Sequence, residues 1–374
     1  MQKTFEMQRK QSLDSHPYSF LIVKMSALGD IIHALSVADY LKEKFPKCTV
    51  SWVVEERFED LVSAASSVDV VYPISIKSVR KNFFSLLLSI SSFRKNLKKQ
   101  TFDVVLDLQG NTKSAFVLSL IKAKKKVGFS RSCVSEWPNL LATHSKIDVD
   151  LSHQISSQYL TFVRKYFLDE ETFLPKPIFL ADESPEIFQK FHQEQRAANR
   201  KILMICPGSN WENKRLSDDV LKNLLQRLET KFDLSFVFIY GSEKEKIFAE
   251  QLTTKYKHAT FLGRLQISKW QALMREVDLV FAVDSSALHL ASIGEVPTFS
   301  VFGPSSLSVY KPSGSLHKGI QGTCPYGKTF VKHCPLLRTC KTGACIKEIK
   351  VDDLEKSFSK FYESLFSTDA NCIK

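Results

Sequence analysis

Short apolar runs alternate along the chain with loops and with stretches in which apolar residues recur at helical spacing. Residues 20–24 form the first apolar run, and residues 30–45 place their apolar side chains on one face of a predicted helix. The same pattern predicts strands at 51–54, 70–74 and 103–108 and a helix at 112–121. Strands that alternate with helices indicate a parallel sheet covered on both faces.

A second series of the same kind occupies the other half of the chain. Its predicted strands are 201–206, 236–240, 279–283 and 297–302. One helix is predicted at 217–228 with Ser217 as its N-cap, and another runs to Ile293 with Gly294 ending it. Two doubly wound α/β halves that face one another form a cleft, and ligands of such sheets bind at the carboxyl ends of the strands.

The pattern loosens from about residue 151 to residue 200, which separates the two series. We therefore predict an α/β protein with an N-terminal domain at 18–181 and a C-terminal domain at 182–374. Residues 1–17 are predicted to form a mobile polar extension without the apolar core of a secretory signal, so we expect a cytoplasmic protein.

Charge is unevenly distributed along the 374 residues. The formal net charge is +12, and residues 77–131 hold thirteen basic and two acidic residues. A strongly basic N-terminal half predicts an acidic partner, which is nucleic acid, an anionic membrane surface or a phosphorylated substrate. Residues 81–99 combine apolar side chains with cations at both ends and fit either a helix on an anionic membrane surface or a helix docked on the sheet. We interpret Lys122–Lys126 as a solvated turn.

Common catalytic motifs are absent from the sequence. It contains no P-loop, no dinucleotide-binding glycine motif, no zincin motif and no nucleophile elbow. The acid pair at 148–150 has a spacing that some metal-dependent enzymes use, but solvated charge is the favoured interpretation.

Four loops at predicted strand ends carry candidate chemistry. Asp30 opens a helix and is either a first-turn residue favoured by the helix dipole or a general base. The loop at 207–215 combines small hydroxyl residues with Lys214 and Arg215, which suits a phosphate or a polar surface. The other two loops are 240–245 and 283–289, whose acids and hydroxyls fit sugar recognition or helix capping.

Together these segments resemble the lipopolysaccharide heptosyltransferases of glycosyltransferase family nine. The similarity is carried by LIVKMSALGDIIHAL, WVVEERFEDLV, VVLDLQGNTKSA, the loop ending in Lys214, and VDSSALHLASIGEVPTFSVFGPS. It implies a GT-B fold of two Rossmann-like domains and inverting transfer of heptose from ADP-heptose to a Kdo residue of lipid A. It also implies no obligatory metal, no nucleic-acid partner and a peripheral place on the cytoplasmic face of the inner membrane.

The resemblance assigns roles to individual residues. Asp30 matches the family's general base, and Lys214 matches a lysine that contacts the donor's phosphates. The other donor-binding positions are Ser209, Asn210, Glu245, Asp284, Ser285, Ser286 and His289. The acceptor-binding cations are Lys77, Arg80 and Lys81. The alternatives are a related glycosyltransferase with another sugar or acceptor and, ranked last, a non-catalytic nucleic-acid-binding protein.

The sequence departs from the family pattern at three places. Ser286 stands where the family has a glycine, and Ser135 stands near a position that often holds arginine, for which Arg131 could substitute. The third is an insert at 324–345 that contains Cys324, Cys334, Cys340 and Cys345. We expect reduced thiols there, ahead of disulfides and, third, a structural zinc site.

Overall fold

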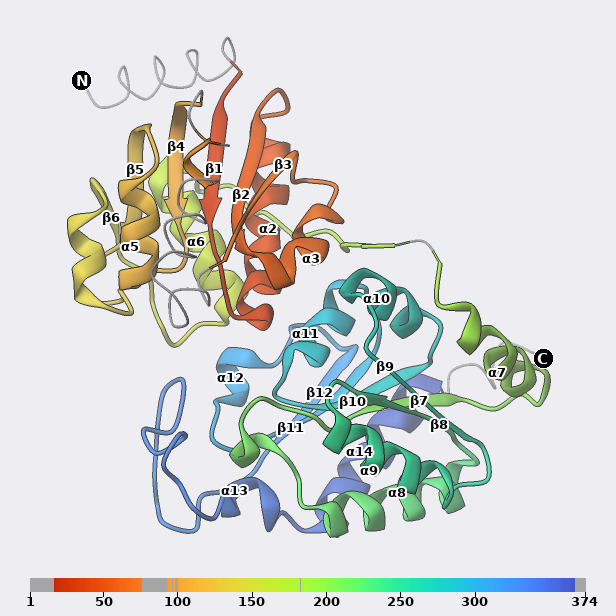
Figure 1. Ribbon diagram of the computed structural model, residues 1–374. Coiled ribbons are helices and arrows are strands. Elements are labelled where there is room, and N and C mark those ends of the chain that lie inside the picture. The colour runs from red at the N-terminus through yellow and green to blue at the C-terminus, as the bar shows by residue number, and fades with distance from the viewer. Residues whose placement is uncertain (1–16, 76–92, 96, 98–99, 182, 367–374) are drawn as a thin grey trace. The chain divides into compact units, whose positions relative to one another are not determined.

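The chain forms two compact units in a computed structural model that describes residues 17–75, 93–95, 97, 100–181 and 183–366. Unit 1 comprises Met1–Leu151 and Ile155–Lys176, and unit 2 comprises Ser152–Gln154 and Pro177–Lys374 (Figure 1). The chain passes from one unit to the other at Lys176, five residues before the predicted boundary. Residues 1–16, most of the predicted extension, lie outside the described part.

Unit 1 is built on a six-stranded sheet in which all neighbours are parallel, in the order β3-β2-β1-β4-β5-β6. The strands are β1 Ser19–Val23, β2 Thr49–Glu55, β3 Val70–Ile74, β4 Phe102–Asp107, β5 Ala123–Phe129 and β6 Ser145–Ile147. From β1 the chain builds the sheet outwards to β3 and then returns to add β4 on the other side of β1. The junction of β1 and β4 is therefore the topological switch point, where doubly wound sheets bind ligands.

Helices cover the unit 1 sheet because their apolar stripes match its two apolar faces. They are α2 Leu28–Lys44, α3 Glu59–Ser63, α5 Thr112–Ser119 and α6 Ile155–Phe167, with short 3-10 turns at Glu56–Phe58 and Trp137–Leu141. Phe20, Leu21, Ile22 and Val23 of β1 are fully buried, as expected for a central strand of a parallel sheet. The helix α2 packs along α6.

Unit 2 repeats this topology with a sheet in the order β12-β11-β10-β7-β8-β9, again parallel throughout. Its strands are β7 Ile202–Cys206, β8 Ser235–Tyr240, β9 Ala259–Gly263, β10 Leu279–Val283, β11 Thr298–Phe302 and β12 His317–Gln321. The switch point here lies between β7 and β10. The loops that follow these two strands therefore open at the same edge of the sheet.

The helices of unit 2 enclose a core centred on β7, β8, β10 and β11. They are α7 Glu186–Ala197, α8 Asp218–Phe232, α9 Glu243–Thr253, α10 Ile267–Arg275, α11 Ser286–Ile293, α12 Leu307–Tyr310, α13 Ala344–Lys347 and α14 Val351–Phe366, with a 3-10 turn at Glu212–Lys214. The last helix, α14, packs on α8 and contributes Phe358, which is fully buried, to the core. Ser217 caps α8 as predicted, by accepting a hydrogen bond from the Val220 N–H.

One element prediction is wrong. The segment Lys122–Lys126 is not a solvated turn, because Ala123–Phe129 forms β5 between β4 and β6. Lys124 and Lys125 are exposed on this strand, and the Lys126 ammonium donates to the Leu118 carbonyl at 2.7 Å. Backbone pairing on both sides of β5 overrides the polar character of the lysines.

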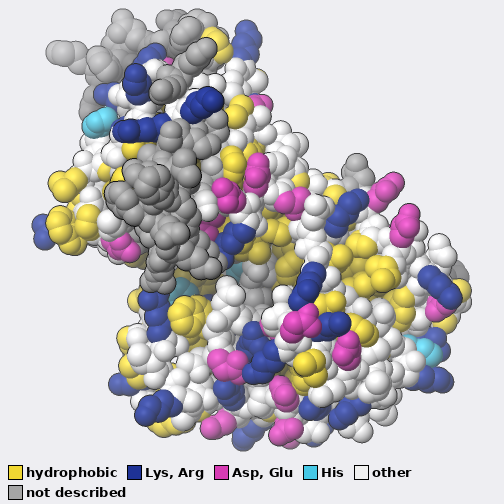
Figure 2. Space-filling view, viewed as in Figure 1, with side chains coloured by type: hydrophobic (Ala, Val, Ile, Leu, Met, Phe, Trp, Pro, Cys, Tyr) yellow, Lys and Arg dark blue, Asp and Glu magenta, His cyan; other side chains and the backbone are white. Residues whose placement is uncertain are grey.

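No helix in the described part of the chain is both long and apolar enough to cross a membrane. The membrane-surface interpretation of 81–99 falls largely outside the described residues, although Phe93 and Leu97 are described and are buried in the unit 1 core. On the face of unit 2 shown in Figure 2, basic and acidic side chains are intermingled rather than gathered into a patch of one sign.

Candidate active site

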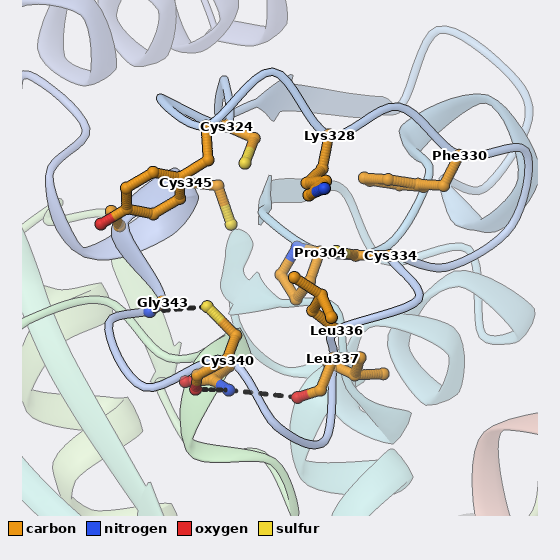
Figure 3. A pocket seen from close by; sticks show the side chains of 13 residues that line it. Pro304, Cys324, Lys328, Phe330, Cys334, Leu336, Leu337, Cys340, Gly343 and Cys345 are labelled. Atoms are coloured by element: carbon orange, nitrogen blue, oxygen red, sulfur yellow. Dashed lines mark hydrogen bonds between the residues drawn. The ribbon is translucent and has the colours of Figure 1, made fainter.

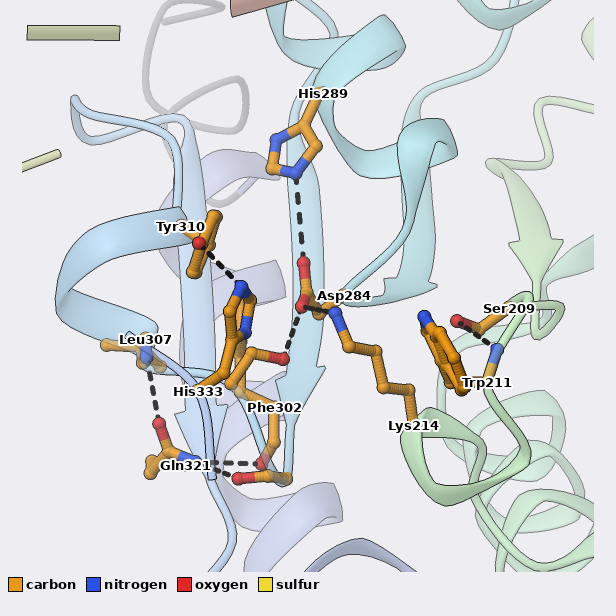
Figure 4. A network of polar contacts seen from close by, with 12 residues as sticks. Ser209, Trp211, Lys214, Asp284, His289, Phe302, Leu307, Tyr310, Gln321 and His333 are labelled. Atoms are coloured by element: carbon orange, nitrogen blue, oxygen red, sulfur yellow. Dashed lines mark hydrogen bonds and ion pairs between the residues drawn. The ribbon is translucent and has the colours of Figure 1, made fainter. Parts of the chain in front are cut away.

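A buried ion pair joins the two loops at the switch point of unit 2. Asp284 follows β10 directly, and its Oδ2 accepts a hydrogen bond from the Lys214 ammonium at 2.6 Å (Figure 4). The Ser305 hydroxyl donates to the same oxygen, while Oδ1 lies 3.8 Å from Nε2 of His289. The Asp284 and Lys214 side chains are 6% and 12% exposed, so both charges are largely withdrawn from water.

The surroundings of Asp284 favour its charged form. Burial by itself would raise the pKa of the Asp284 carboxyl, but the neighbouring His289 and the Lys214 charge hold that pKa well below its usual range. Asp284 is therefore a carboxylate at neutral pH. An anion held at Oδ2 by Lys214 and Ser305 is a fixed acceptor at this edge of the sheet.

The loop after β10 leaves polar groups available at the start of α11. Ser285 occupies the N-cap position of α11, but its hydroxyl makes no capping hydrogen bond. Within the described residues this hydroxyl is buried and has no hydrogen-bond partner. The first N–H groups of a helix lack intrahelical acceptors, so a hydroxyl and backbone donors lie together where an anion binds well. The alternative that Asp284 caps this helix is not what the structure shows.

Ser286 is the first residue of α11. A helical backbone suits any L-residue at this position, so the serine in place of the family's glycine requires no unusual backbone conformation.

The loop after β7 is held by Arg215. Its guanidinium donates from Nε and Nη2 to the Ser209 carbonyl, at 2.9 and 2.7 Å, and from Nη2 to Glu245 at 2.6 Å. The Ser209 hydroxyl accepts a weak hydrogen bond from the Trp211 N–H at 3.4 Å. Asn210 is exposed at the tip of the loop.

Glu245 links this loop to the next strand end. Its Oε2 accepts from the Gly241 and Ser242 N–H groups, which closes the N-terminus of α9, while Oε1 accepts from Arg215. A Cβ atom on Gly208 would lie 2.7 Å from Oε1, so the loop passes close to the carboxylate. The structure thus gives Glu245 the helix-capping role that the sequence also allowed, next to the predicted donor site.

The cysteine-containing insert packs directly against these loops. The Asn213 side-chain amide donates to the Leu337 and Cys340 carbonyls at 3.1 and 2.7 Å. The Cys334 N–H donates to the Pro304 carbonyl at 2.7 Å, one residue before Ser305. The insert therefore supports the positions of both Lys214 and Ser305, through contacts that no local sequence pattern indicates.

The insert's four cysteines line one cavity of about 30 Å³ (Figure 3). The seven cysteines in the described part of the chain form no disulfide with one another, and Cys372 lies beyond that part. Among the described side chains no three histidine, cysteine or acidic residues are placed to hold a metal ion. Burial and the three neighbouring thiols raise the pKa of Cys345 to about 11.

Asp30 lies at the corresponding switch point of unit 1. It is in the first turn of α2, and its Oδ2 accepts a hydrogen bond from the Ala27 N–H at 3.2 Å. The loop is tied to the end of β4, because Gln109 accepts hydrogen bonds from the Met25 and Ser26 N–H groups at 3.0 and 3.1 Å. The side chain of Asp30 remains 38% exposed, which leaves it accessible to a ligand.

The remaining predicted residues are the acceptor cations and the acid pair at 148–150. The acceptor cations Lys77, Arg80 and Lys81 lie outside the described residues. Asp148 accepts hydrogen bonds from the Ser130 and Ser132 hydroxyls, which lower the pKa of its carboxyl. Asp148 and Asp150 are both exposed, as the interpretation of residues 148–150 as solvated charge predicts.

Comparison with known proteins places the chain in a family. A sequence profile described as glycosyltransferase family 9 (heptosyltransferase) matches residues 90–339, about two thirds of the chain. This chain belongs to glycosyltransferase family 9. A relative from Campylobacter coli, lipopolysaccharide heptosyltransferase 1, is 26% identical over 91% of this chain and 98% of its own length. The enzyme of the same name from Pseudomonas aeruginosa is 27% identical over 76% of this chain and 79% of its own length.

Solved structures of family 9 glycosyltransferases share the fold. The Escherichia coli heptosyltransferase WaaC with ADP superimposes with a TM-score of 0.73 at 18% identity, over 92% of this chain and 99% of that one. A family 9 glycosyltransferase from Veillonella parvula gives a TM-score of 0.74 at 15% identity, over 92% and 97% of the two chains. The expected GT-B fold of two Rossmann-like units is confirmed, and this family 9 member is a glycosyltransferase.

Proposed function

We propose that this glycosyltransferase transfers heptose from ADP-L-glycero-D-manno-heptose to a Kdo residue of lipid A, with inversion, in the manner of a type I heptosyltransferase. The names of its relatives from Campylobacter coli and Pseudomonas aeruginosa support this assignment. The observation that carries it is the buried Lys214–Asp284 pair, which lies beside the N-terminus of α11 at the switch point of unit 2.

The geometry of unit 2 suits a sugar linked to a diphosphate. The Lys214 ammonium has three N–H donors, one of which is used by Asp284, so the others can bind phosphate oxygens. Further donors to the diphosphate are the hydroxyls of Ser285 and Ser286 and the first N–H groups of α11. Asp284 and His289 accept hydrogen bonds from the hydroxyl groups of the heptose. Ser209, Asn210 and Glu245 contact the nucleotide part of the donor. These donors stabilise the leaving diphosphate without a metal ion.

Asp30 acts as the general base on the acceptor. A carboxylate accepts the proton of the Kdo hydroxyl while that oxygen attacks the anomeric carbon and the bond to the diphosphate breaks. Lys77, Arg80 and Lys81 bind the acidic groups of the acceptor. Because lipid A is embedded in a membrane, the enzyme works at the cytoplasmic face of the inner membrane.

Release of ADP from ADP-heptose, with and without Kdo–lipid A, tests the proposal. We expect release that depends on both substrates and persists in the presence of a chelator. Release from another nucleotide sugar in preference to ADP-heptose would assign a different donor. An Asp30→Asn variant should bind ADP normally but lose about 100-fold or more in kcat, the usual contribution of a general base. Unchanged turnover in that variant would exclude Asp30 as the base.

A further inference from the structure

A buried lysine lies behind the proposed base. Lys24 follows β1 directly, and its side chain is only 5% exposed. Its ammonium lies 3.8 Å from Oδ2 of Asp30 and 5.2 Å from the centre of the Tyr159 ring on α6. Lysine is almost never buried without a charged partner, so this position needs an explanation.

Two carboxyl groups face the Lys24 ammonium. Burial lowers the pKa of Lys24, while Asp30 and Asp107 oppose that effect. Asp107 is fully buried at the end of β4, and its oxygens already accept hydrogen bonds from other groups. These donors are the Gln109 and Gly110 N–H groups, the Ser114 hydroxyl and the Asn139 amide. Asp30 is therefore the acid that Lys24 contacts directly.

The two oxygens of Asp30 have different environments. Oδ2 accepts the Ala27 N–H and faces Lys24, whereas Oδ1 makes no hydrogen bond to the described part of the chain. A carboxylate held by one oxygen keeps its second oxygen in a fixed position. Base catalysis is sensitive to such placement, because the proton must be within hydrogen-bond reach of its acceptor.

We propose that Lys24 is a positioning residue that anchors Oδ2 of Asp30 and thereby presents Oδ1 to the acceptor hydroxyl. The proposal rests on the proposed function of Asp30. In the reaction the hydroxyl proton moves to Oδ1, the hydroxyl oxygen bonds to the anomeric carbon, and the diphosphate leaves as ADP with the electron pair of the broken bond. The competing explanation is that Lys24 only fills space beneath Tyr159.

The test compares Lys24→Met and Lys24→Gln with wild type, alone and in an Asp30→Asn background. Methionine keeps the length and the packing of the lysine stem but removes its charge, and glutamine is the second variant should methionine prevent folding. Lys126→Met is the matched control, because that partly buried unit 1 lysine donates only to a backbone carbonyl. ADP binding, measured by calorimetry, reports whether each variant retains an intact donor site.

We expect either Lys24 variant to lower kcat about tenfold or more and to leave the KM for ADP-heptose unchanged. This loss is smaller than the roughly 100- to 10,000-fold contribution of a general base, because Asp30 itself remains. In the Asp30→Asn background the same substitution should cause no further loss, because the base that it positions is gone.

Equal kcat values for wild type and the Lys24 variants would overturn the proposal. So would an equal loss in both backgrounds, since a purely structural role predicts additive effects. Absence of acceptor-dependent ADP release from the wild type would instead refute the proposed function itself, so the two failures are distinguishable.

Discussion

At the scale of single residues, the proposed donor site of unit 2 depends on the buried charge of Asp284, which is stable only beside its polar neighbours. Asp284 is buried, and its carboxylate form is maintained by Lys214, His289 and Ser305. Removing one member of a buried ion pair typically costs about 3–5 kcal/mol, because the remaining charge keeps its desolvation penalty without its partner. Asp284 is thus both a proposed ligand for the sugar and a structural requirement of the site.

Asp284→Asn should therefore lower the free energy of unfolding of unit 2 by about 3 kcal/mol at pH 7. Because the folded-state pKa of Asp284 lies below that of the unfolded chain, its contribution is complete above the ordinary carboxyl range and is lost as the pH falls towards the folded pKa. The difference between wild type and variant should stay constant from about pH 7 to pH 5 and narrow below about pH 4. Urea unfolding at several pH values measures it.

Asp233→Asn is the matched control for this substitution. Asp233 pairs with Arg200 at 3.2 Å but is 76% exposed, and it adopts a left-handed conformation that asparagine also tolerates. An exposed pair contributes about 1 kcal/mol at most, so this control should unfold almost as wild type does. Equal urea midpoints for the two variants at pH 7 would contradict the importance of the buried pair.

Asp30, Lys214 and Asp284 could be singled out as candidates from the sequence, because each lies in a loop that follows an apolar strand. The strand ends of a parallel sheet converge, so polar residues that follow apolar runs are candidates on the strength of the pattern alone. The contacts of Lys24 with Asp30 and of Ser305 with Asp284 could not be predicted in the same way. The importance of these two residues arises from burial and from contacts to residues in other loops, and neither property is visible in a local pattern.

At the scale of elements, the central strands and the edge strand β3 were predicted from the sequence, whereas β5, β6, β9 and β12 were not. β1, β7 and β10 are buried on both faces and therefore appear as continuous apolar runs. β5 has three lysines directly after Ala123, and this first part of the strand is exposed or half-buried, with Lys124 paired to Asp103 at 2.7 Å. Its strand conformation is decided by hydrogen bonds to β4 and β6, which are distant in sequence.

The contact between the insert and the 3-10 turn Glu212–Lys214 gives an element-scale prediction. Asn213→Asp keeps the shape of the side chain but removes both donors to the Leu337 and Cys340 carbonyls. Losing two hydrogen bonds of about 1 kcal/mol each should make local opening of the insert roughly 30-fold more frequent. We expect the labelling of Cys345 by a maleimide to accelerate accordingly, and the KM for ADP-heptose to rise.

The cysteines themselves provide an internal reference for this experiment. Hydrogen bonds from the Gly343 N–H and Thr342 lower the pKa of Cys340, whereas burial and the other three thiols raise that of Cys345 to about 11. Cys340 should therefore react first in the wild type, because the thiolate is the reactive form. The control for Asn213→Asp is Asn199→Asp, which makes the same change at an exposed position. Identical Cys345 labelling in the Asn213→Asp variant and the wild type would refute the proposed support of the loop.

At the scale of the whole molecule, each unit has its own sheet and core, and each carries one half of the proposed chemistry. The core of unit 1 is built around β1 and β4, and that of unit 2 around β7, β8, β10 and β11. The proposed donor groups all belong to unit 2, whereas Asp30 and Lys24 belong to unit 1. A ligand that binds one unit should thus leave the proposed groups of the other unit unaffected.

ADP alone should therefore stabilise unit 2 selectively. A ligand at about 100 times its Kd adds about 2.7 kcal/mol to the free energy of unfolding of the part of the chain that binds it. Hydrogen exchange with mass spectrometry should show slower exchange in the loops at 207–215, 241–245 and 284–286, which contain the proposed ligands. The loop at 24–30 should exchange at its original rate until the acceptor is added as well. If ADP alone slowed exchange in the 24–30 loop as much as in the unit 2 loops, the donor would engage both units. That result would contradict the assignment of donor binding to unit 2 alone.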